Sequence, residues 1–167
     1  MPPLHSAAYS ADVEAVRQLL AAGALPDLRD DKGYTALLWA SFRAAVADQV
    51  PIIEALIAAG ANPNATTSLG DSSCLMLAVQ SGCESAVAAL IAGGAHVDLQ
   101  ADGVTPLMVA AHVGAVEIAE FLLQSGANPA VRAGRYTAAD YARYAAHDDL
   151  ADLLDQAVAA GASPNSA

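Results

Sequence analysis

The stretch DGVTPLMVAAH, residues 102–112, combines a turn with the start of an apolar helix. The hydroxyl of Thr105 can cap a helix that begins at Pro106, because a threonine oxygen accepts a hydrogen bond from a free N–H group of the first turn. Proline suits the first helical turn, where its missing N–H is not needed. The stretch therefore predicts a loop that leads into an N-capped and largely buried helix.

Pieces of this stretch recur along the chain. The aligned segments are PPLHSAAYS (2–10), TALLWASFR (35–43), SCLMLAVQS (73–81), TPLMVAAHV (105–113) and TAADYARYA (137–145). Within them, one common position is held by Leu4, Leu37, Leu75, Leu107 and Ala139, at spacings of 33, 38, 32 and 32 residues. A glycine-alanine marker follows in AAGALPD, AAGANPN, AGGAHVD and QSGANPA. A period in the low thirties indicates a solenoid, in which each repeat buries its apolar face against the next.

The run GVTPLMVAAHVGAVEIAEFLLQSGAN, residues 103–128, closely resembles the ankyrin repeat pattern, and the resemblance covers roughly residues 2–157. It implies an all-α ankyrin solenoid of stacked helix-turn-helix repeats joined by short turns or hairpins. A single domain is expected over 1–160, followed by a flexible tail at 161–167. The expected repeats are approximately 2–29, 30–67, 68–99, 100–131 and 132–158.

Departures from the pattern distinguish individual repeats. The second repeat has four extra residues, an insert at 44–47, which form either an added turn on its first helix or a longer loop between its helices. In the third repeat, Asp71 and Cys74 replace the glycine and proline of the pattern, which is expected to weaken its turn. The last helix, DDLADLLDQAVAA, is more acidic than the others and is expected to cap the stack.

Composition limits the classes of partner. The formal net charge of −11 argues against nucleic acid, whose phosphates require Lys and Arg, and against anionic membrane surfaces. It favours a partner protein with a basic surface. Polar runs interrupt every apolar stretch before it is long enough to span a membrane, and the N-terminus lacks the features of a signal peptide.

Two further features of composition bear on the source and the compartment. The cysteines Cys74 and Cys83 are too few for a disulfide framework, so a reducing, cytoplasmic compartment is expected. The chain contains 42 alanines, which favour helix and close backbone packing, and this richness hints at a GC-rich bacterial genome.

The resemblance to ankyrin repeats implies a concave binding face, formed by the exposed side of each first helix and by the turn tips. The first-helix position, five residues after the aligned leucine, carries Tyr9, Phe42, Gln80, His112 and Tyr144. The turn-tip position carries Tyr34, Ser72, Val104 and Tyr136. Five of the eight aromatic residues fall at these positions, and aromatic side chains are preferred interface anchors.

Arg43 and Asp102 complete the predicted partner-binding set, and Asp31, Lys32 and Leu69 are expected at its rim. An alternative interpretation is that the aromatic residues only fill the groove between adjacent repeats, and that solvated surface accounts for the rim. Trp39 aligns with Leu77 and Val109 of other repeats, so it is predicted to belong to the core.

Nothing in the sequence indicates a catalytic, metal or cofactor site. His5, His96, His112 and His147 fall on different elements, and none has the spacing of a metal-binding pair. In the ankyrin pattern the His5 position is structural and bonds to a neighbouring turn, whereas His112 could make a pH-sensitive contact with a partner. Cys83 has no histidine base in its own repeat. The cluster of Asp148, Asp149, Asp152 and Asp155 is interpreted as a solvated helix face.

The sequence therefore predicts a non-catalytic protein that is a monomer when unbound and binds another protein through its concave face. An inhibitor, an antitoxin-like immunity protein or an adaptor would fit this description. The alternatives are an exported effector that binds host proteins and a scaffold that self-associates.

Overall fold

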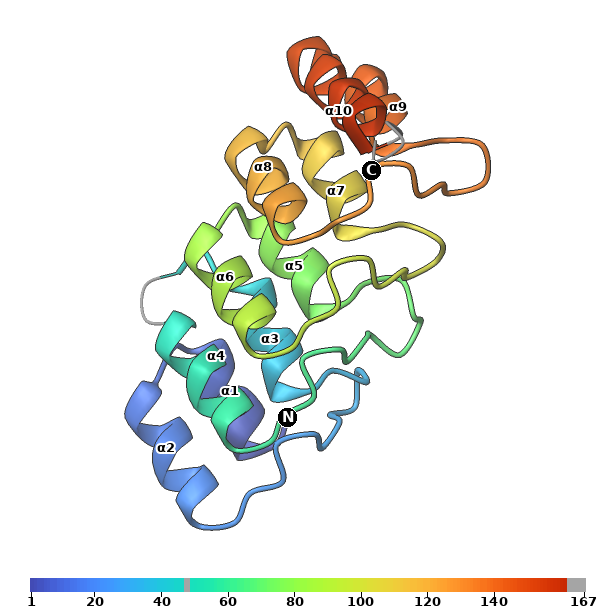
Figure 1. The fold of residues 1–167 in the computed structure, drawn as a ribbon. Helices are drawn as coiled ribbons and strands as arrows, with labels where there is room; N and C mark the ends of the chain where they lie inside the picture. The colour runs from blue at the N-terminus through green and yellow to red at the C-terminus, as the bar shows by residue number, and fades with distance from the viewer. Residues whose placement is uncertain (47–48, 162–167) are drawn as a thin grey trace, which may run out of the picture.

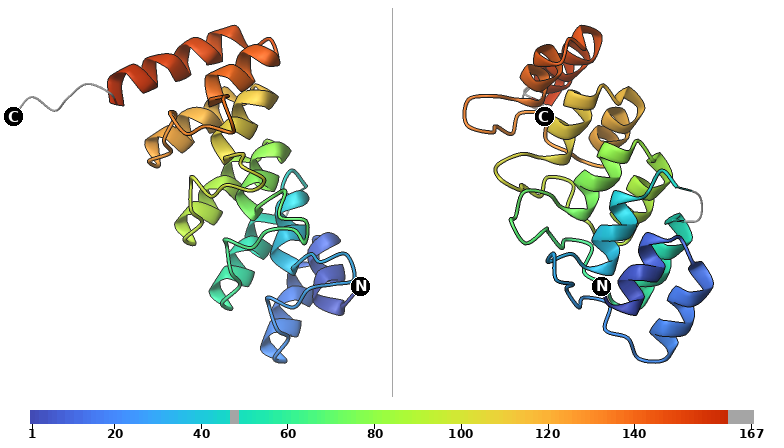
Figure 2. Two further views of the ribbon diagram at one scale, coloured as in Figure 1. Left: turned by 90° about the vertical axis from the view of Figure 1, so that its right-hand side faces the viewer. Right: turned by 180° about the vertical axis from the view of Figure 1, so that it is seen from behind.

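The computed structural model describes residues 1–46 and 49–161, in which ten α-helices form five pairs that stack in chain order (Figure 1). The N-terminal pair and the C-terminal pair lie at opposite ends of the stack (Figure 2). Within the described residues the only strand-like pairings are isolated bridges in the loops. The expected all-α solenoid is confirmed. The helices are α1 (Pro3–Tyr9), α2 (Val13–Ala21), α3 (Ala36–Phe42), α4 (Gln49–Ala58), α5 (Cys74–Ser81), α6 (Glu84–Ala92), α7 (Pro106–Val113), α8 (Val116–Gln124), α9 (Ala138–Tyr144) and α10 (Asp148–Gly161).

The helices form two rows. The first helices of the pairs (α1, α3, α5, α7 and α9) contact one another in sequence and make the inner row, and the second helices make the outer row. The segments that join one pair to the next project to one side as hairpin-like loops (Figure 1). We call the exposed side of the inner row, together with the loop tips, the inner face. It corresponds to the predicted concave face.

Hydroxyl caps determine where most inner helices begin. Thr105 Oγ1 accepts a hydrogen bond from the backbone N–H of Met108 (3.3 Å), and Pro106 is the first helical residue, as predicted. Helix α1 begins after Pro2 and has no side-chain cap. The same cap is provided for α3, α5 and α9 by Thr35, Ser73 and Thr137.

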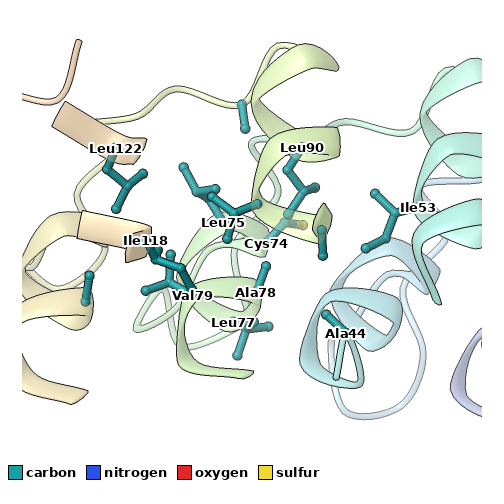
Figure 3. Close-up of a cluster of buried hydrophobic side chains, with 14 of the residues drawn as sticks. Ala44, Ile53, Cys74, Leu75, Leu77, Ala78, Val79, Leu90, Ile118 and Leu122 are labelled. Atoms are coloured by element: carbon teal, nitrogen blue, oxygen red, sulfur yellow. The ribbon is translucent and has the colours of Figure 1, made fainter. Parts of the chain in front are cut away.

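Small and branched apolar side chains fill the space between the rows. Leu75 and Leu107 of the aligned position are 1% exposed, and neighbouring alanines such as Ala78 and Ala110 are fully buried. Figure 3 shows side chains of α5 meeting those of the pairs on either side, including Ile53 of α4 and Leu122 of α8. Because alanine has only a methyl group, consecutive inner helices can approach closely while the leucines fill the gaps.

Hydrogen bonds also link consecutive repeats on the loop side. After each of the first four outer helices the chain turns at a glycine in the left-handed region, such as Gly94 (φ 94°). Four residues beyond three of these glycines, a carboxyl or amide oxygen accepts a hydrogen bond from a backbone N–H of the next repeat. We call this set of three hydrogen bonds the loop ladder. The backbone N–H groups of Asn62, His96 and Asn128 donate to Oδ1 of Asp27 (2.9 Å), Asn64 (2.8 Å) and Asp98 (3.1 Å), respectively.

The structure settles how the insert is accommodated. Helix α3 has seven residues and α7 has eight, so the extra residues do not extend α3 and instead lengthen the connection to α4. Ala47 of the insert lies outside the described residues. Buried Gln49, at the start of α4, donates from Nε2 to the carbonyl oxygen of Ala8 in the first repeat (2.9 Å).

Two other departures have specific outcomes. The third-repeat turn is hydrogen-bonded despite Asp71: the hydroxyl of Thr67 donates to the Asp71 carboxylate, and the Thr67 N–H donates to the Ser72 carbonyl (2.9 Å). Helix α10 includes Gly161, the first residue of the predicted tail, and the rest of that tail, 162–167, lies outside the described residues. Among the described helices, none combines the length and the apolar character that crossing a membrane requires.

Candidate functional site

Four aromatic rings of the first two repeats meet at the N-terminal end of the inner face. Tyr34 stacks on Trp39 with ring centroids 4.6 Å apart, while Tyr9 and Phe42 contact Trp39 edge-on at 5.3 and 6.1 Å. These rings surround a depression of about 560 Å³, which we call the N-terminal hollow. It is lined by Met1, Tyr9, Lys32, Tyr34, Trp39 and Phe42.

Trp39 is held in place by Asp30. The indole Nε1–H donates to Asp30 Oδ2 (2.8 Å), while Oδ1 accepts from the backbone N–H groups of Lys32 and Tyr34 (2.9 Å each). Trp39 is 8% exposed, so its predicted burial is confirmed, but its ring also forms part of the hollow's wall. The role of Asp30 is not evident from the sequence, because nothing in the pattern distinguishes it from the adjacent Asp31.

These hydrogen bonds change the acidity of Asp30. Burial raises the pKa of its carboxyl, but the hydrogen bonds from Trp39, Tyr34 and Lys32 outweigh burial, and the pKa lies below its usual range. A group whose pKa is lowered by folding stabilises the fold above its unfolded pKa, which is about 3.9 for Asp. That stabilisation is lost as the pH falls through the folded pKa.

We therefore expect the substitution Asp30→Asn to lower the free energy of unfolding more at pH 7 than at pH 3. Urea titrations followed by Trp39 fluorescence at both pH values would measure the difference. Asp31→Asn, at an exposed neighbouring position, is the matched control and should have little effect at either pH. An equal loss for Asp30→Asn at pH 7 and pH 3 would contradict the assigned role of the carboxylate.

One cation, Lys32, lines the N-terminal hollow, and a second, Arg43, lies over the ring of its wall residue Tyr9. Lys32 Nζ lies 5.6 Å from the centroid of the Trp39 ring, and Arg43 Cζ lies 4.8 Å from that of Tyr9. Both positions suit cation–π attraction to the electron-rich ring faces. Arg43 is half-buried, and its Nε is a buried donor without a hydrogen-bond partner among the described residues.

A second group of aromatic residues lies at the C-terminal end of the inner face. His112 of α7 and Tyr144 of α9 stack with ring centroids 6.4 Å apart. Tyr144 is 86% exposed, and Tyr136 at the preceding loop tip is 46% exposed. We call the adjoining depression of about 540 Å³ the C-terminal hollow. It is lined by His112, Tyr136, Asp140, Tyr141, Arg143 and Tyr144.

The acidic last helix pairs with one of the residues that line the C-terminal hollow. Arg143 forms ion pairs with Asp155 and, at 3.8 Å, with Asp152. Asp148 and Asp149 are exposed, as predicted for a solvated helix face. The carboxylates of Asp152 and Asp155 therefore already compensate part of the positive charge of Arg143.

The remaining predicted site residues lie between the two hollows. Gln80 and Asp102 are exposed but line neither hollow, and Val104 is half-buried and packs against the core. The predicted row of aromatic residues is therefore divided into two groups. Ring contacts between neighbouring repeats exist for Tyr9–Trp39 and His112–Tyr144, as the groove-filling interpretation requires, yet Phe42 remains 50% exposed.

His5 and Cys74 have the buried environments expected of structural residues. His5 is fully buried, with Nε2 2.8 Å from the Leu28 carbonyl and 3.1 Å from the Tyr34 carbonyl, so its predicted bonding to a neighbouring turn is confirmed. Burial raises the pKa of the Cys74 thiol to about 12, which disfavours the reactive thiolate. Cys83 is half-exposed at the start of α6. Residues 1–46 and 49–161 contain no group of three or more His, Cys, Asp or Glu arranged to hold a metal ion.

Comparison with known proteins agrees with this architecture. A family model described as ankyrin repeats (3 copies) matches residues 1–67, 41–133 and 75–166. The chain is also 39% identical over 112 residues to the Mus musculus protein NF-kappa-B inhibitor delta. That alignment covers 64% of this chain but only 31% of the mouse protein, so the chain spans less than a third of that relative. With the family model matched along nearly its whole length, the chain belongs to the ankyrin repeat family.

Proposed function

We propose that this chain is a non-catalytic module that binds a partner protein through the inner face. The observation that carries the proposal is the gathering of exposed aromatic side chains into two hollows, one at each end of that face. Membership of the ankyrin repeat family and the similarity to a protein named as an inhibitor support a protein-interaction role.

The physical basis is preorganisation. Phe42 and Tyr144 can bury large areas on binding while losing few rotamers, and each already contacts a neighbouring ring. Residues between the hollows, such as Gln80 and Asp102, would make polar contacts around these anchors. An inhibitor that covers a surface of its partner is the form of action that we favour. An antitoxin-like immunity protein or an adaptor would use the same face.

The test is capture of partners from a lysate of the source organism by wild type and by the variant Phe42→Ala/Tyr144→Ala. We expect the double variant to bind the captured partner at least about tenfold more weakly, because truncating an aromatic anchor of an interface to alanine typically costs more than about 1 kcal/mol. Binding of the purified partner by calorimetry would measure the change, and circular dichroism would verify that both proteins are folded.

A matched control separates the inner face from exposed apolar surface in general. Leu25→Ala/Val116→Ala removes two exposed apolar side chains that line neither hollow, and it should leave the affinity unchanged. A partner retained equally by wild type and by Phe42→Ala/Tyr144→Ala would place the interface elsewhere. If no partner is captured, sedimentation at increasing concentration would test the self-associating scaffold, and capture from host lysate would test the exported effector.

A further inference from the structure

Charge is distributed unevenly between the two rows of helices. Arg17 is the one Lys or Arg on an outer helix. Five of the other basic residues (Lys32, Arg43, Arg132, Arg135 and Arg143) lie on inner helices, on loop tips or directly beside them. The acidic residues of the outer helices are Glu14, Glu54, Glu84, Glu117, Glu120, Asp148, Asp149, Asp152 and Asp155. The net charge of −11 therefore reflects the outer row much more than the inner face.

In the part of the chain that the structure describes, the cations beside the N-terminal hollow are not paired with carboxylates. Within the described residues, neither Lys32 nor Arg43 forms an ion pair with a carboxylate, in contrast to Arg143 near the other hollow. The nearby carboxylate of Asp30 already accepts three hydrogen bonds, from Trp39, Tyr34 and Lys32. These bonds use most of the lone pairs with which it could accept further hydrogen bonds. The hollow thus combines apolar walls with one lining cation, Lys32, and with a second cation, Arg43, that lies over the ring of its wall residue Tyr9.

Aromatic walls next to cations disfavour a cationic ligand and favour an apolar ligand that carries carboxylates. A cationic side chain would be attracted to the ring faces, but Lys32 and Arg43 already lie over Trp39 and Tyr9 and would repel it. An apolar or aromatic side chain suits the walls formed by Tyr9, Tyr34, Trp39 and Phe42. Carboxylates next to that side chain could pair with the two cations, and an arginine fork is well suited to carboxylate.

We propose that the N-terminal hollow binds an acidic segment of the partner protein, with an apolar or aromatic side chain in the hollow and flanking Asp or Glu carboxylates on Lys32 and Arg43. The inference rests on the proposed protein-binding function and specifies the partner's chemistry at one end of the inner face. It differs from the expectation, based on net charge, of a basic partner surface, which would suit the acidic outer row.

The experiment uses the single tryptophan as a reporter at the site. In a ¹⁵N–¹H spectrum the indole N–H of Trp39 gives one resonance, because the chain has no other tryptophan. Three capped peptides would be titrated at physiological ionic strength: Glu-Glu-Phe-Glu-Glu, Lys-Lys-Phe-Lys-Lys and Glu-Glu-Ala-Glu-Glu. We expect a saturable shift with the first peptide and a dissociation constant about tenfold lower than for either of the others.

The variant Lys32→Glu/Arg43→Glu should reverse the preference, so that the lysine peptide binds more tightly than the glutamate peptide. Arg17→Glu makes a charge change of the same kind on outer helix α2 and should leave the preference unchanged. The expected order of affinities, together with its reversal, would support the inference. Absence of any saturable shift, a lysine peptide that binds wild type as tightly, or a glutamate preference that survives the reversal would overturn it.

Failure of this inference and failure of the proposed function give different results. Partner capture and its loss in Phe42→Ala/Tyr144→Ala depend on the aromatic side chains and not on the sign of the partner's charge. If that test succeeds while the peptide preference is absent, only the acidic segment is excluded. If the captured partner binds equally well to both proteins, the inner face itself is excluded as the interface.

Discussion

Replacing Leu107 with alanine should lower the free energy of unfolding by about 2–5 kcal/mol. The Leu107 side chain is 1% exposed in α7, a helix that contacts α5, α8 and α9. The substitution removes buried methyl groups and leaves a cavity that these helices can fill only in part. Because each repeat in a solenoid contacts only its neighbours, the loss weakens the connection of α9 and α10 to the first three repeats.

Urea denaturation followed by circular dichroism would measure the effect. Leu69→Ala removes the same side chain from a loop tip where it is 86% exposed, and it should change the stability by less than about 0.5 kcal/mol. A broadened transition for Leu107→Ala would show that the C-terminal repeat unfolds separately. A loss below about 1 kcal/mol would mean that Leu107 does not help to hold the repeats together.

Gly114→Ala is the second change with a large expected effect, about 2–4 kcal/mol of destabilisation. Gly114 ends α7 in the left-handed region (φ 71°), where a side chain costs about 1–2 kcal/mol. A Cβ at this position would lie only 2.5–2.8 Å from ring atoms of His147. The turn before α8 and the turn before α10 would therefore have to separate, or the imidazole would have to rotate away.

Gly82→Ala is the matched control, because Gly82 has nearly the same backbone conformation (φ 74°) and open space around it. Gly82→Ala should lower the free energy of unfolding by only about 1 kcal/mol, which is the cost of placing a side chain in the left-handed region. Ala11 and Ala146 already adopt this conformation in the first and last repeats. Thermal denaturation would compare the two variants. In the double variant Gly114→Ala/His147→Ala the steric part should disappear, and equal losses for Gly114→Ala and Gly82→Ala would contradict the role given to His147.

The fold could be predicted from the sequence because the repeated signals are local. The aligned leucines, the capping hydroxyls and the glycine turns each act within one repeat or between neighbours, so a linear pattern contains nearly all of the architecture. The insert shows where this local reasoning ends. Four extra residues near Arg43 are compatible with a longer helix or a longer loop, and contacts between distant residues, such as that of Gln49 with Ala8 of the first repeat, are not contained in the local pattern.

The site could be predicted only in part. Position in the repeat identified Tyr9, Phe42 and Tyr144 as exposed side chains of the inner helices, and their exposure agrees. Their division into two hollows depends on ring contacts between residues about thirty positions apart, and a pattern of single positions does not specify side-chain directions. Asp30 was missed for the same reason, since only its orientation toward the Trp39 indole separates it from Asp31.

The loop ladder has a consequence for how the molecule can bend. Its three hydrogen bonds connect the first four repeats, whereas Ala130 occupies the next ladder position with only a methyl group. Helix α10 packs mainly on α9, so the last repeat is joined to the stack chiefly through the inner row. A change of curvature at this junction therefore breaks no bond of the loop ladder, although α7 and α9 pack closely together and Gly114 lies against His147 across it. His112 and Tyr144 lie on its two sides, so such a change would alter the width of the C-terminal hollow and leave the loop ladder intact.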